Sequence, residues 1–314
     1  MNTVIGDLFT CPAAWSGRDD GPGAEHARWH SVIGTGEARD AVAVLGFATD
    51  EGVRRNGGRQ GAAKGPEALR GALGSLAVHH NYTLVDAGTV VTQGEDLEQA
   101  QRELSDRVRA QAAAGNLVVV LGGGHETSFA SHRGAYEALG AMHVINFDAH
   151  FDLRAAAQPT SGTPFRNIAE LVGDEFDYSV FGISRPNNTK VLFDAARKLN
   201  VRTVLDTELA ELSPHQAAKL AVAAVDGDLP IHVSIDLDVL PAAVAPGVSA
   251  PAGLGVALEH IHAMVTAVAA TGRVALFDVV ELNPVFDVDN RTARTAARLI
   301  NDFVDAHVAA VSRG

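Results

Sequence analysis

Short apolar runs alternate with amphipathic segments along most of this chain. The apolar runs predict eight strands, at residues 41–49, 82–85, 117–121, 142–145, 178–183, 201–205, 231–235 and 274–280. Amphipathic spacing predicts helices that open at residue 66 and that cover residues 97–114, 214–225, 258–270 and 291–310. Because parallel strands that alternate with helices are joined by right-handed crossovers, we expect a mostly parallel sheet with helices on both faces.

The first 40 residues do not share this pattern. They carry glycine, proline and charge without clear periodicity, so we expect an irregular lead-in over residues 1–40, with one short helix near 24–31. No linker rich in Pro, Gly and Ser divides the remainder, and 314 residues suffice for one large α/β domain. Residues 41–314 are therefore predicted to form a single domain.

Composition argues against several classes of function. The formal net charge of −13 opposes a nucleic-acid partner, because a phosphate backbone would be repelled. The only cysteine, Cys11, excludes an intrachain disulfide and a thiolate metal cluster. The chain has no basic N-terminal region and no apolar run of ~18 residues or more, so we expect a cytoplasmic protein without a signal peptide or a membrane partner. A homo-oligomer is compatible with the sequence, which does not fix the oligomeric state.

A cluster of metal-ligating residue types follows the predicted strand at 142–145. Asp148, His150 and Asp152 are spaced two residues apart, so in an extended chain their side chains project to one side. Carboxylate oxygen combined with imidazole nitrogen, without sulfur, suits a divalent cation such as Mn²⁺. We therefore expect these three side chains to ligate metal.

Further groups of the same kind follow other predicted strands. His125, Asp236, Asp238 and Glu281 each lie at or just beyond the end of one. Ligands of open parallel sheets bind outside the carboxyl ends of the strands, so we expect all of these groups to share one site. The six histidine and aspartate side chains are too many for one ion with open positions, whereas two ions that share a carboxylate would use them all. Without cations, carboxylates buried so close together would repel one another strongly.

Three segments resemble the signatures of the ureohydrolase family, which comprises arginases, agmatinases and formimidoylglutamases. They are Gly-Gly-His-Glu at 123–126, Asp-Ala-His-Phe-Asp at 148–152 and Ser-Ile-Asp-Leu-Asp-Val-Leu at 234–240. The resemblance implies an arginase-like α/β fold with three layers, α-β-α, around an eight-stranded, mostly parallel sheet. It also implies a binuclear manganese centre, with two Mn²⁺ per subunit.

The same resemblance implies roles for individual residues. One ion would be held by His125, Asp148, Asp152 and Asp236. The other would be held by Asp148, His150, Asp236 and Asp238. Glu281 matches the glutamate that receives the amidine-like nitrogens of the substrate in this family. Asp152 is expected, from its position, to pass a proton to the leaving amine.

Departures from the arginase pattern indicate which member of the family the chain resembles. Arginases and agmatinases carry His-Gly-x-Pro in the loop after the fourth strand, where this chain has Ser161 in place of the histidine. Arginases also have asparagine where Arg154 stands, and arginine is a bidentate donor to carboxylates. These features are similar to formimidoylglutamase, whose small-molecule substrate carries two carboxylates. Ser161, Arg166 and Arg185 are further candidates for substrate contacts.

The expected reaction is the hydrolysis of N-formimidoyl-L-glutamate to L-glutamate and formamide, a step in histidine degradation. One alternative is a guanidino hydrolase, such as an agmatinase or guanidinobutyrase, that releases urea. Arg154 would repel the cationic tail of agmatine, which argues against an agmatinase. The other alternative is a catalytically inactive metal-binding protein on the same fold, against which the complete set of six ligands and Glu281 argues.

Overall fold

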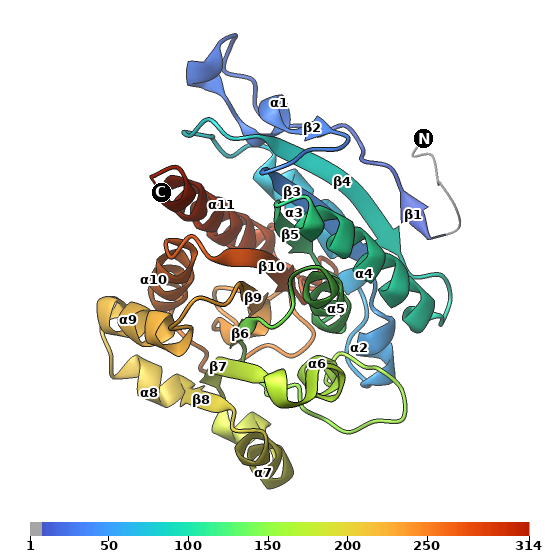
Figure 1. Cartoon of the computed structure of the whole chain (residues 1–314), viewed down its shortest axis with the longest axis vertical. Helices are drawn as coiled ribbons and strands as arrows, with labels where there is room; N and C mark the ends of the chain where they lie inside the picture. Colours follow the sequence, from blue (N-terminus) through green and yellow to red (C-terminus); the bar gives the residue numbers. More distant parts are fainter. Residues whose placement is uncertain (1–7, 314) are drawn as a thin grey trace.

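One ten-stranded sheet forms the centre of the computed structural model, which describes residues 8–313 (Figure 1). In chain order the strands are β1 (Phe9–Thr10), β2 (Gly34–Thr35), β3 (Val42–Ala48), β4 (Leu84–Val91), β5 (Leu117–Leu121), β6 (His143–Phe147), β7 (Asp177–Ile183), β8 (Arg202–Leu205), β9 (Ile231–Asp236) and β10 (Val274–Val280). Their order in space is β1-β4-β3-β5-β10-β9-β6-β7-β8, with β2 also beside β4. Every pairing is parallel except that of β1 with β4.

Helices cover both faces of the sheet (Figure 1). One face carries α3 (Gly65–Leu73), α9 (Pro214–Ala224), α10 (Leu258–Ala269) and α11 (Arg291–Val311). The other carries α4 (Leu97–Ala113), α5 (Thr127–Leu139) and α6 (Pro164–Val172). Shorter helices are α1 (Trp29–Val32), α2 (Glu51–Arg55), α7 (Lys190–Lys198) and α8 (Asp206–Ala210). The predicted three-layer α-β-α fold is confirmed, and within residues 8–313 no helix is long and apolar enough to cross a membrane.

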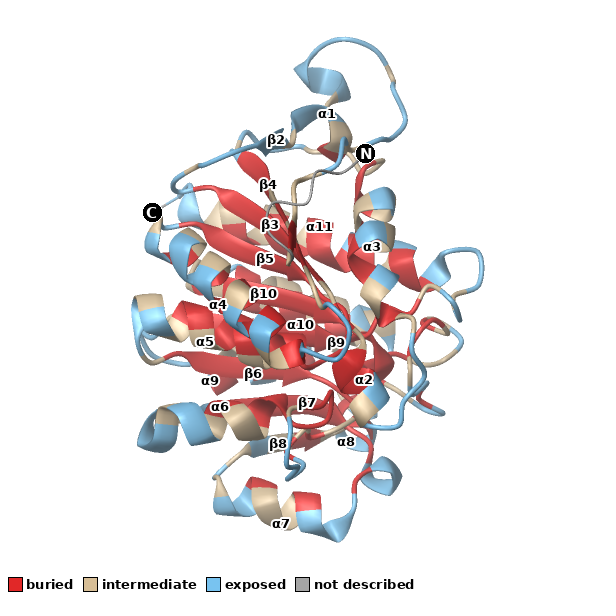
Figure 2. Ribbon diagram, turned by 90° about the vertical axis from the view of Figure 1, so that its right-hand side faces the viewer, coloured by how far each residue is buried: buried red, intermediate tan, exposed pale blue. Residues whose placement is uncertain are grey.

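The central strands are apolar along their length because helices bury both of their faces. In β5, Val119 and Leu121 belong to the core that includes α3, α10 and α11, whereas Val118 and Val120 pack against α4 and α5. Figure 2 shows these strands as buried, with exposed residues concentrated on the outer sides of the helices and in loops. Strands covered on both faces read as continuous apolar runs. That pattern explains why the predicted bounds of β5 match those in the structure.

Strand β4 differs from its predicted position at 82–85. The apolar pattern ends before Asp86, but the strand runs from Leu84 to Val91. Asp86 lies inside it because Arg70 donates two hydrogen bonds to its carboxylate, at 2.8 and 2.9 Å, and Trp15 donates another at 2.7 Å. A buried charge is tolerated when it is paired and hydrogen-bonded. The predicted end of this strand was therefore wrong because an ion pair allows the strand to include a charged residue.

The lead-in also contributes to the sheet. Both β1 and β2 pair with β4, which is why the sheet has ten strands where eight were predicted. The short helix expected near residues 24–31 corresponds to a 3₁₀ turn at Ala24–His26 followed by α1. The division of the chain at residue 40 stays a prediction.

The four strands that lead to the predicted site residues are neighbours at the middle of the sheet. In spatial order they are β5, β10, β9 and β6, and all of their pairings are parallel. Their carboxyl ends therefore meet at one edge. This arrangement brings residues from four distant parts of the sequence close together at that edge.

The packing of α11 on β10 gives a prediction about stability. Phe303 of α11 stacks on Phe277 of β10 with ring centroids 3.8 Å apart, and both rings are buried. We predict that Phe303→Ala lowers the free energy of unfolding by about 3–5 kcal/mol, because it removes a buried ring and leaves a cavity. Urea unfolding measures the change. As a control, Val311→Ala alters a residue of the same helix that is 57% exposed, and should change the free energy by less than about 0.5 kcal/mol. Equal losses in the two variants would contradict this account of the core.

Candidate metal centre

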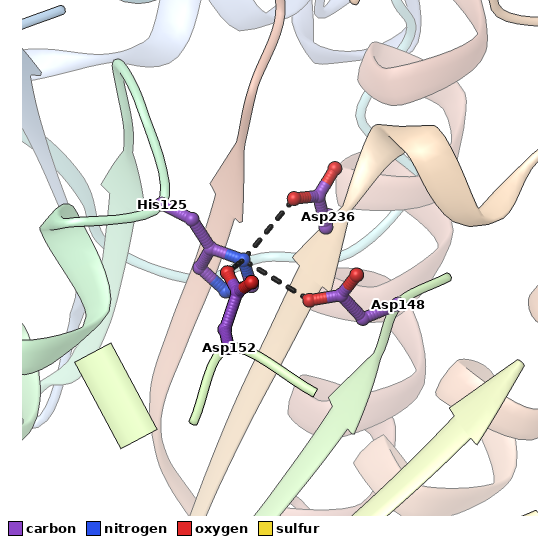
Figure 3. A group of neighbouring side chains, drawn as sticks. All are labelled: His125, Asp148, Asp152 and Asp236. Atoms are coloured by element: carbon purple, nitrogen blue, oxygen red, sulfur yellow. Dashed lines mark ion pairs between the residues drawn. The ribbon is translucent and has the colours of Figure 1, made fainter. Parts of the chain in front are cut away.

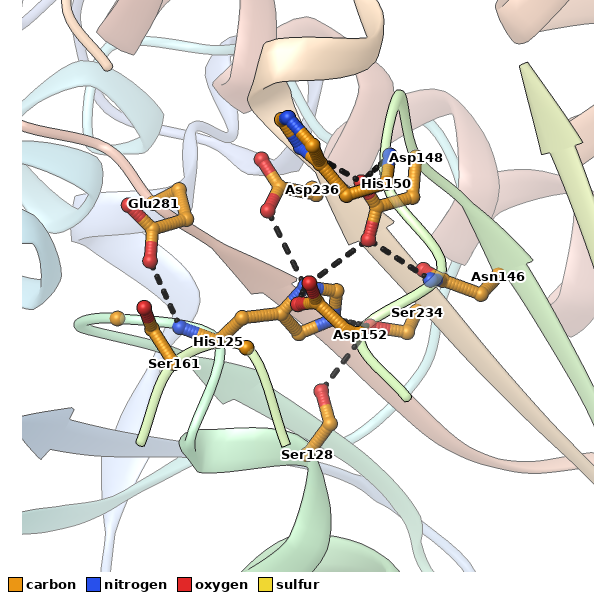
Figure 4. A network of polar contacts seen from close by, with 12 residues as sticks. His125, Ser128, Asn146, Asp148, His150, Asp152, Ser161, Ser234, Asp236 and Glu281 are labelled. Carbon is orange, nitrogen blue, oxygen red and sulfur yellow. Dashed lines mark hydrogen bonds and ion pairs between the residues drawn. The ribbon is translucent and has the colours of Figure 1, made fainter. Parts of the chain in front are cut away.

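The ends of the central strands bring the candidate ligands together. His125 follows β5, Asp148 comes directly after β6, and Asp236 is the last residue of β9. Figure 4 shows these side chains converging on one point, with Glu281 from the end of β10 beside them. The expectation that these groups share one edge of the sheet agrees with the geometry.

His125 lies at the centre of the first group. Its Nδ1 atom is 3.0 Å from a carboxylate oxygen of Asp152, 3.1 Å from one of Asp236 and 3.2 Å from one of Asp148 (Figure 3). This nitrogen is buried and has no partner in hydrogen-bond geometry among the described residues. Four potential ligand atoms, all within 4.8 Å of one another, thus surround a shared point.

A second group adjoins the first. His150 Nδ1 lies 3.0 Å from Asp238 Oδ2 and 3.6 Å from Asp148 Oδ1. Asp148 belongs to both groups, because its Oδ2 atom faces His125 while Oδ1 faces His150. It is therefore placed as the shared carboxylate that a two-ion centre requires. The resemblance also put Asp236 in the second set, but its ligand atom groups only with the first.

Crowding of carboxylates dominates the electrostatics of the centre. Burial raises the pKa of Asp152 to about 6 and that of Asp236 well above its ordinary value, and the nearby charge of Asp148 adds to both shifts. Although burial alone would raise the pKa of Asp148, the neighbouring His125 and His150 hold it below its usual range. Burial acts against the charged form of His150 as well, but the carboxylate of Asp238 raises its pKa to about 12. Added positive charge would therefore stabilise the ionised form of every acid in the cluster.

The residues present fit divalent cations at both groups. Oxygen and nitrogen ligands without sulfur suit Mn²⁺ and similar ions. His125 Nδ1 faces three carboxylate oxygens but makes no hydrogen bond to them, which is the arrangement expected of a nitrogen that binds metal. Outer hydrogen bonds also hold the ligands in place, as expected of metal sites. Asn146 Nδ2 donates to Asp148 at 3.0 Å, and Ser234 contacts the far ring nitrogen of His125 at 3.1 Å.

Glu281 is held in place by a strained backbone. Its φ of 67° lies in the left-handed region, which costs a residue with a side chain of order 1–3 kcal/mol. Its own N–H donates to Gly123 O at 2.7 Å, and its carboxylate accepts from the His125 N–H at 2.9 Å. Asp152 has a similar φ of 50°. Burial, followed by the charge of Glu126, raises the pKa of Glu281 to about 8, so a cationic group in the cavity would favour its ionised form.

A cavity of about 330 Å³ opens above the metal centre. Its lining includes Arg154 and Ser161 together with Glu281 and ligands of both groups. The guanidinium of Arg154 has neither an ion-pair nor a hydrogen-bond partner within the described part of the chain. A cation without a counter-charge at the mouth of the cavity suits an anionic group of a bound molecule.

Arg166 and Arg185 do not line this cavity, in contrast to their predicted role in substrate contact. Arg166 lies on the outer side of α6, where it pairs with Glu170 one helical turn away at 3.0 Å. Arg185 is exposed, with its guanidinium 5.6 Å from the ring centroid of Phe193. The resemblance of their segments to formimidoylglutamase suggested this role, but neither side chain is part of the cavity wall.

Three polar residues of the cavity wall were not predicted. Asn56, Arg59 and Ser249 line it. Arg59 joins two walls, since its backbone N–H and its Nε atom both donate to Ser249 at 2.9 Å, and Asn56 donates to Ser161 at 3.1 Å. Asn56 and Arg59 belong to a glycine-rich segment at residues 54–66. Its composition predicts an irregular backbone, but nothing in the sequence indicates which strand ends this segment covers.

Known proteins share both the sequence pattern and the fold. A model described as "Arginase family" matches residues 40–305. Formimidoylglutamase from Corynebacterium efficiens is 51% identical over 304 residues, which cover 95% of this chain and 96% of that protein. The crystal structure of Trypanosoma cruzi formiminoglutamase with Mn²⁺ has a TM-score of 0.80 at 30% identity, covering 88% of this chain and 97% of that one. Proclavaminate amidino hydrolase from Streptomyces clavuligerus has a TM-score of 0.79 at 26% identity, covering 88% and 96%. The resemblance inferred from the three signature segments is confirmed: this chain belongs to the arginase family.

Proposed function

We propose that this protein hydrolyses N-formimidoyl-L-glutamate, with water, to L-glutamate and formamide. The observation that carries the proposal is one cavity that places the unpartnered cation of Arg154 above the acidic metal centre and Glu281. Such a cavity offers a positive contact for a carboxylate at its mouth and negative groups for an amidine-like cation at its floor. Two relatives that are 51% and 48% identical to this chain are named formimidoylglutamase, which supports the same substrate.

The centre is proposed to hold two Mn²⁺ ions. One would be bound by His125, Asp148, Asp152 and Asp236. The other would be bound by Asp148, His150 and Asp238, with Asp236 as the further ligand that the family resemblance implies. When bound, paired divalent cations supply a Lewis acid that lowers the pKa of water from ~15.7 toward ~7. The T. cruzi relative whose structure contains Mn²⁺ supports the choice of metal.

The protein side chains are proposed to orient the substrate and carry its proton. Arg154, with Ser161 beside it, binds a substrate carboxylate. Glu281 accepts hydrogen bonds from the cationic formimidoyl nitrogens in a buried setting, where an opposite charge counts for more than in water. Asp152, which lines the same cavity, holds the proton that passes to the leaving amine. The carboxylate end and the formimidoyl end of the substrate would thus bind in opposite parts of the cavity.

A second candidate is an amidino hydrolase that releases urea. The structural likeness to proclavaminate amidino hydrolase supports this alternative. The two activities are separated by measuring formamide and urea release from N-formimidoylglutamate, agmatine and 4-guanidinobutyrate. Formamide from the first alone supports the proposal, and urea from either guanidino compound supports the rival. Absence of turnover on all three in the Mn²⁺-loaded protein would instead indicate a metal-binding protein without this catalysis.

Glu281→Gln tests the proposed contact with the amidine nitrogens. The amide keeps the shape of the side chain but loses its charge, so we expect kcat on formimidoylglutamate to fall by about 10²–10³-fold. Steady-state kinetics measure the change. Elemental analysis of bound Mn²⁺ is the control, because the substitution leaves all six ligands in place. A variant with full metal content and normal kcat would rule out this role for Glu281.

Arg154→Ala tests the proposed carboxylate contact. Removal of a charge-assisted hydrogen bond is expected to raise KM about 10- to 100-fold, with a smaller effect on kcat. Arg166→Ala is the matched control, since Arg166 is a nearby arginine outside the cavity and its loss should leave both constants unchanged. If Arg154→Ala has the kinetics of the unaltered enzyme, the substrate assignment fails.

Mn²⁺ should stabilise the fold more at neutral than at acidic pH. Because the pKa of Asp152 is raised to about 6 and that of Asp236 is raised as well, the metal-free fold retains protons that the unfolded chain has already released, and its stability falls as pH rises toward about 6. Metal displaces those protons, so it binds more tightly at higher pH. We expect the Tm difference between Mn²⁺-loaded and chelated protein to grow from about pH 5 to about pH 7.5, with about 2.7 kcal/mol gained per site at a hundredfold excess over Kd. Thermal melts measure it, and an increment independent of pH would contradict the proposed ligands.

A further inference from the structure

A buried carboxylate that is not itself a predicted ligand lies beneath the metal centre. Asp278, in β10, is completely buried. Its Oδ1 atom accepts hydrogen bonds from Ser128 at 3.0 Å and from Ser234, and its Oδ2 atom accepts from Ser131 and from His232 Nε2, both at 2.8 Å. Burial opposes its charge, but the neighbouring His232 and the hydroxyl groups hold its pKa below the usual value. Asp278 is therefore an ionised acceptor for four donors.

The charge of Asp278 determines the direction of the hydrogen bonds around it. An ionised carboxylate can only accept, and Asp278 is closer to the Ser234 hydroxyl than Ser128 is, at 3.1 Å, so Ser234 donates its single hydrogen to Asp278. At its other contact, 3.1 Å from His125 Nε2, Ser234 must then be the acceptor (Figure 4). His125 consequently carries a hydrogen on Nε2. In the neutral imidazole that metal binding requires, this leaves a lone pair on Nδ1, the atom that faces the three carboxylates of the first group.

The far side of Asp278 obeys the same rule. His232 donates to Asp278 through Nε2, and its Nδ1 atom lies 3.2 Å from Nδ1 of His132. Burial lowers the pKa of His132 well below its ordinary value, so this ring is neutral. The hydrogens of Ser131, His232 and Ser234 all point toward Asp278.

We propose that Asp278 is a positioning residue that acts through Ser234 to keep the hydrogen of His125 on Nε2, and so keeps Nδ1 available to bind a metal ion. The inference rests on the proposed metal centre and adds the residue that sets the state of its buried histidine. Metal-binding histidines commonly have their second ring nitrogen fixed in this way, and loss of such a partner costs about 10- to 100-fold in metal affinity. Here a hydroxyl group stands between the ring and the carboxylate.

The proposal predicts an effect on only one of the two ions. The chain of contacts reaches His125, whose group includes Asp152 and Asp236. The second group is centred on His150, whose ring nitrogen contacts Asp148 and Asp238 directly. A disturbance at Asp278 should therefore weaken the first Mn²⁺ site and leave the second nearly unchanged. General damage to the fold would weaken both.

Ser234→Ala and Ser131→Ala form a matched pair for the test. Each removes one buried hydroxyl donor from Asp278, but only Ser234 contacts His125. Stepwise Mn²⁺ titration of the metal-free proteins, followed by calorimetry and by the EPR signal of free Mn²⁺, gives the two affinities. We expect Ser234→Ala to weaken one site about 10- to 100-fold and Ser131→Ala to weaken neither. Thermal melting of the metal-free proteins is expected to show a similar loss of stability in both.

Asp278→Asn tests the carboxylate itself. Its amide nitrogen is expected to face Ser128 and Ser234, because these hydroxyl groups can rotate to accept, whereas the other oxygen position receives the N–H of His232. Ser234 would then donate to His125 Nε2, which moves the ring hydrogen to Nδ1. We expect selective weakening of the same Mn²⁺ site, and no additional loss when Asp278→Asn is combined with Ser234→Ala, since the two act in series.

Each outcome decides the proposal. Unchanged affinities in Ser234→Ala or Asp278→Asn, equal weakening of both sites, or weakening by Ser131→Ala would overturn it. Failure of the proposed function looks different, because the unaltered protein would then bind no Mn²⁺ pair or would release no formamide while the hydrogen-bond network remained intact.

Discussion

Mutual repulsion among buried carboxylates is the constraint on which this structure depends. Asp148, Asp152, Asp236 and Asp238 lie within a few ångströms of two imidazoles at the edge of the sheet. Burial makes each negative charge costly, and each neighbour makes the others costlier. The cluster is stable as an ionised group only when positive charge is supplied, which is why a divalent metal explains it better than structural hydrogen bonding does. The surrounding protein keeps the ligands close in spite of this repulsion.

Rigid elements provide that restraint. Three of the four strands lead directly into site residues, and their parallel registers fix the spacing of the strand ends. Where a side chain must turn inward from the strand path, the backbone accepts strain, as at Asp152 and Glu281 with their positive φ. Beneath the site, α5 turns its polar residues Ser128 and Ser131 toward Asp278. The helix that carries them is buried against the sheet, so these polar contacts cannot be replaced by water.

The sequence alone predicts what depends on repeated local patterns. Apolar runs revealed the central strands, and the two-residue spacing of Asp148, His150 and Asp152 revealed the centre. It does not reveal what depends on a distant partner. Asp86 suggests the end of a strand until Arg70 is seen beside it, and the serines of α5, a helix that was not predicted, have no evident role until Asp278 is seen as their acceptor. Similarly, the resemblance to formimidoylglutamase suggested Arg166 as a substrate contact, whereas in the structure it pairs with Glu170 on the surface of α6.

The residues proposed to contact substrate and the candidate metal ligands lie in separable parts of the fold. The metal ligands come from strand ends, but Arg154 and Ser161 belong to a loop that α2 holds in place. Arg55 donates to Pro159 O at 3.2 Å and pairs with acids of α2 and α4, and Asn56 donates to Ser161. The loop also closes on itself, because the N–H of Arg154 donates to Gly162 O at 2.9 Å, and a Cβ atom on Gly162 would lie only 2.7 Å from the Arg154 side chain. If Arg154 and Ser161 contact the substrate as proposed, changes in this loop would alter which carboxylate or cation the cavity accepts while the strand ends stay the same, a division expected when loops carry specificity on a rigid scaffold.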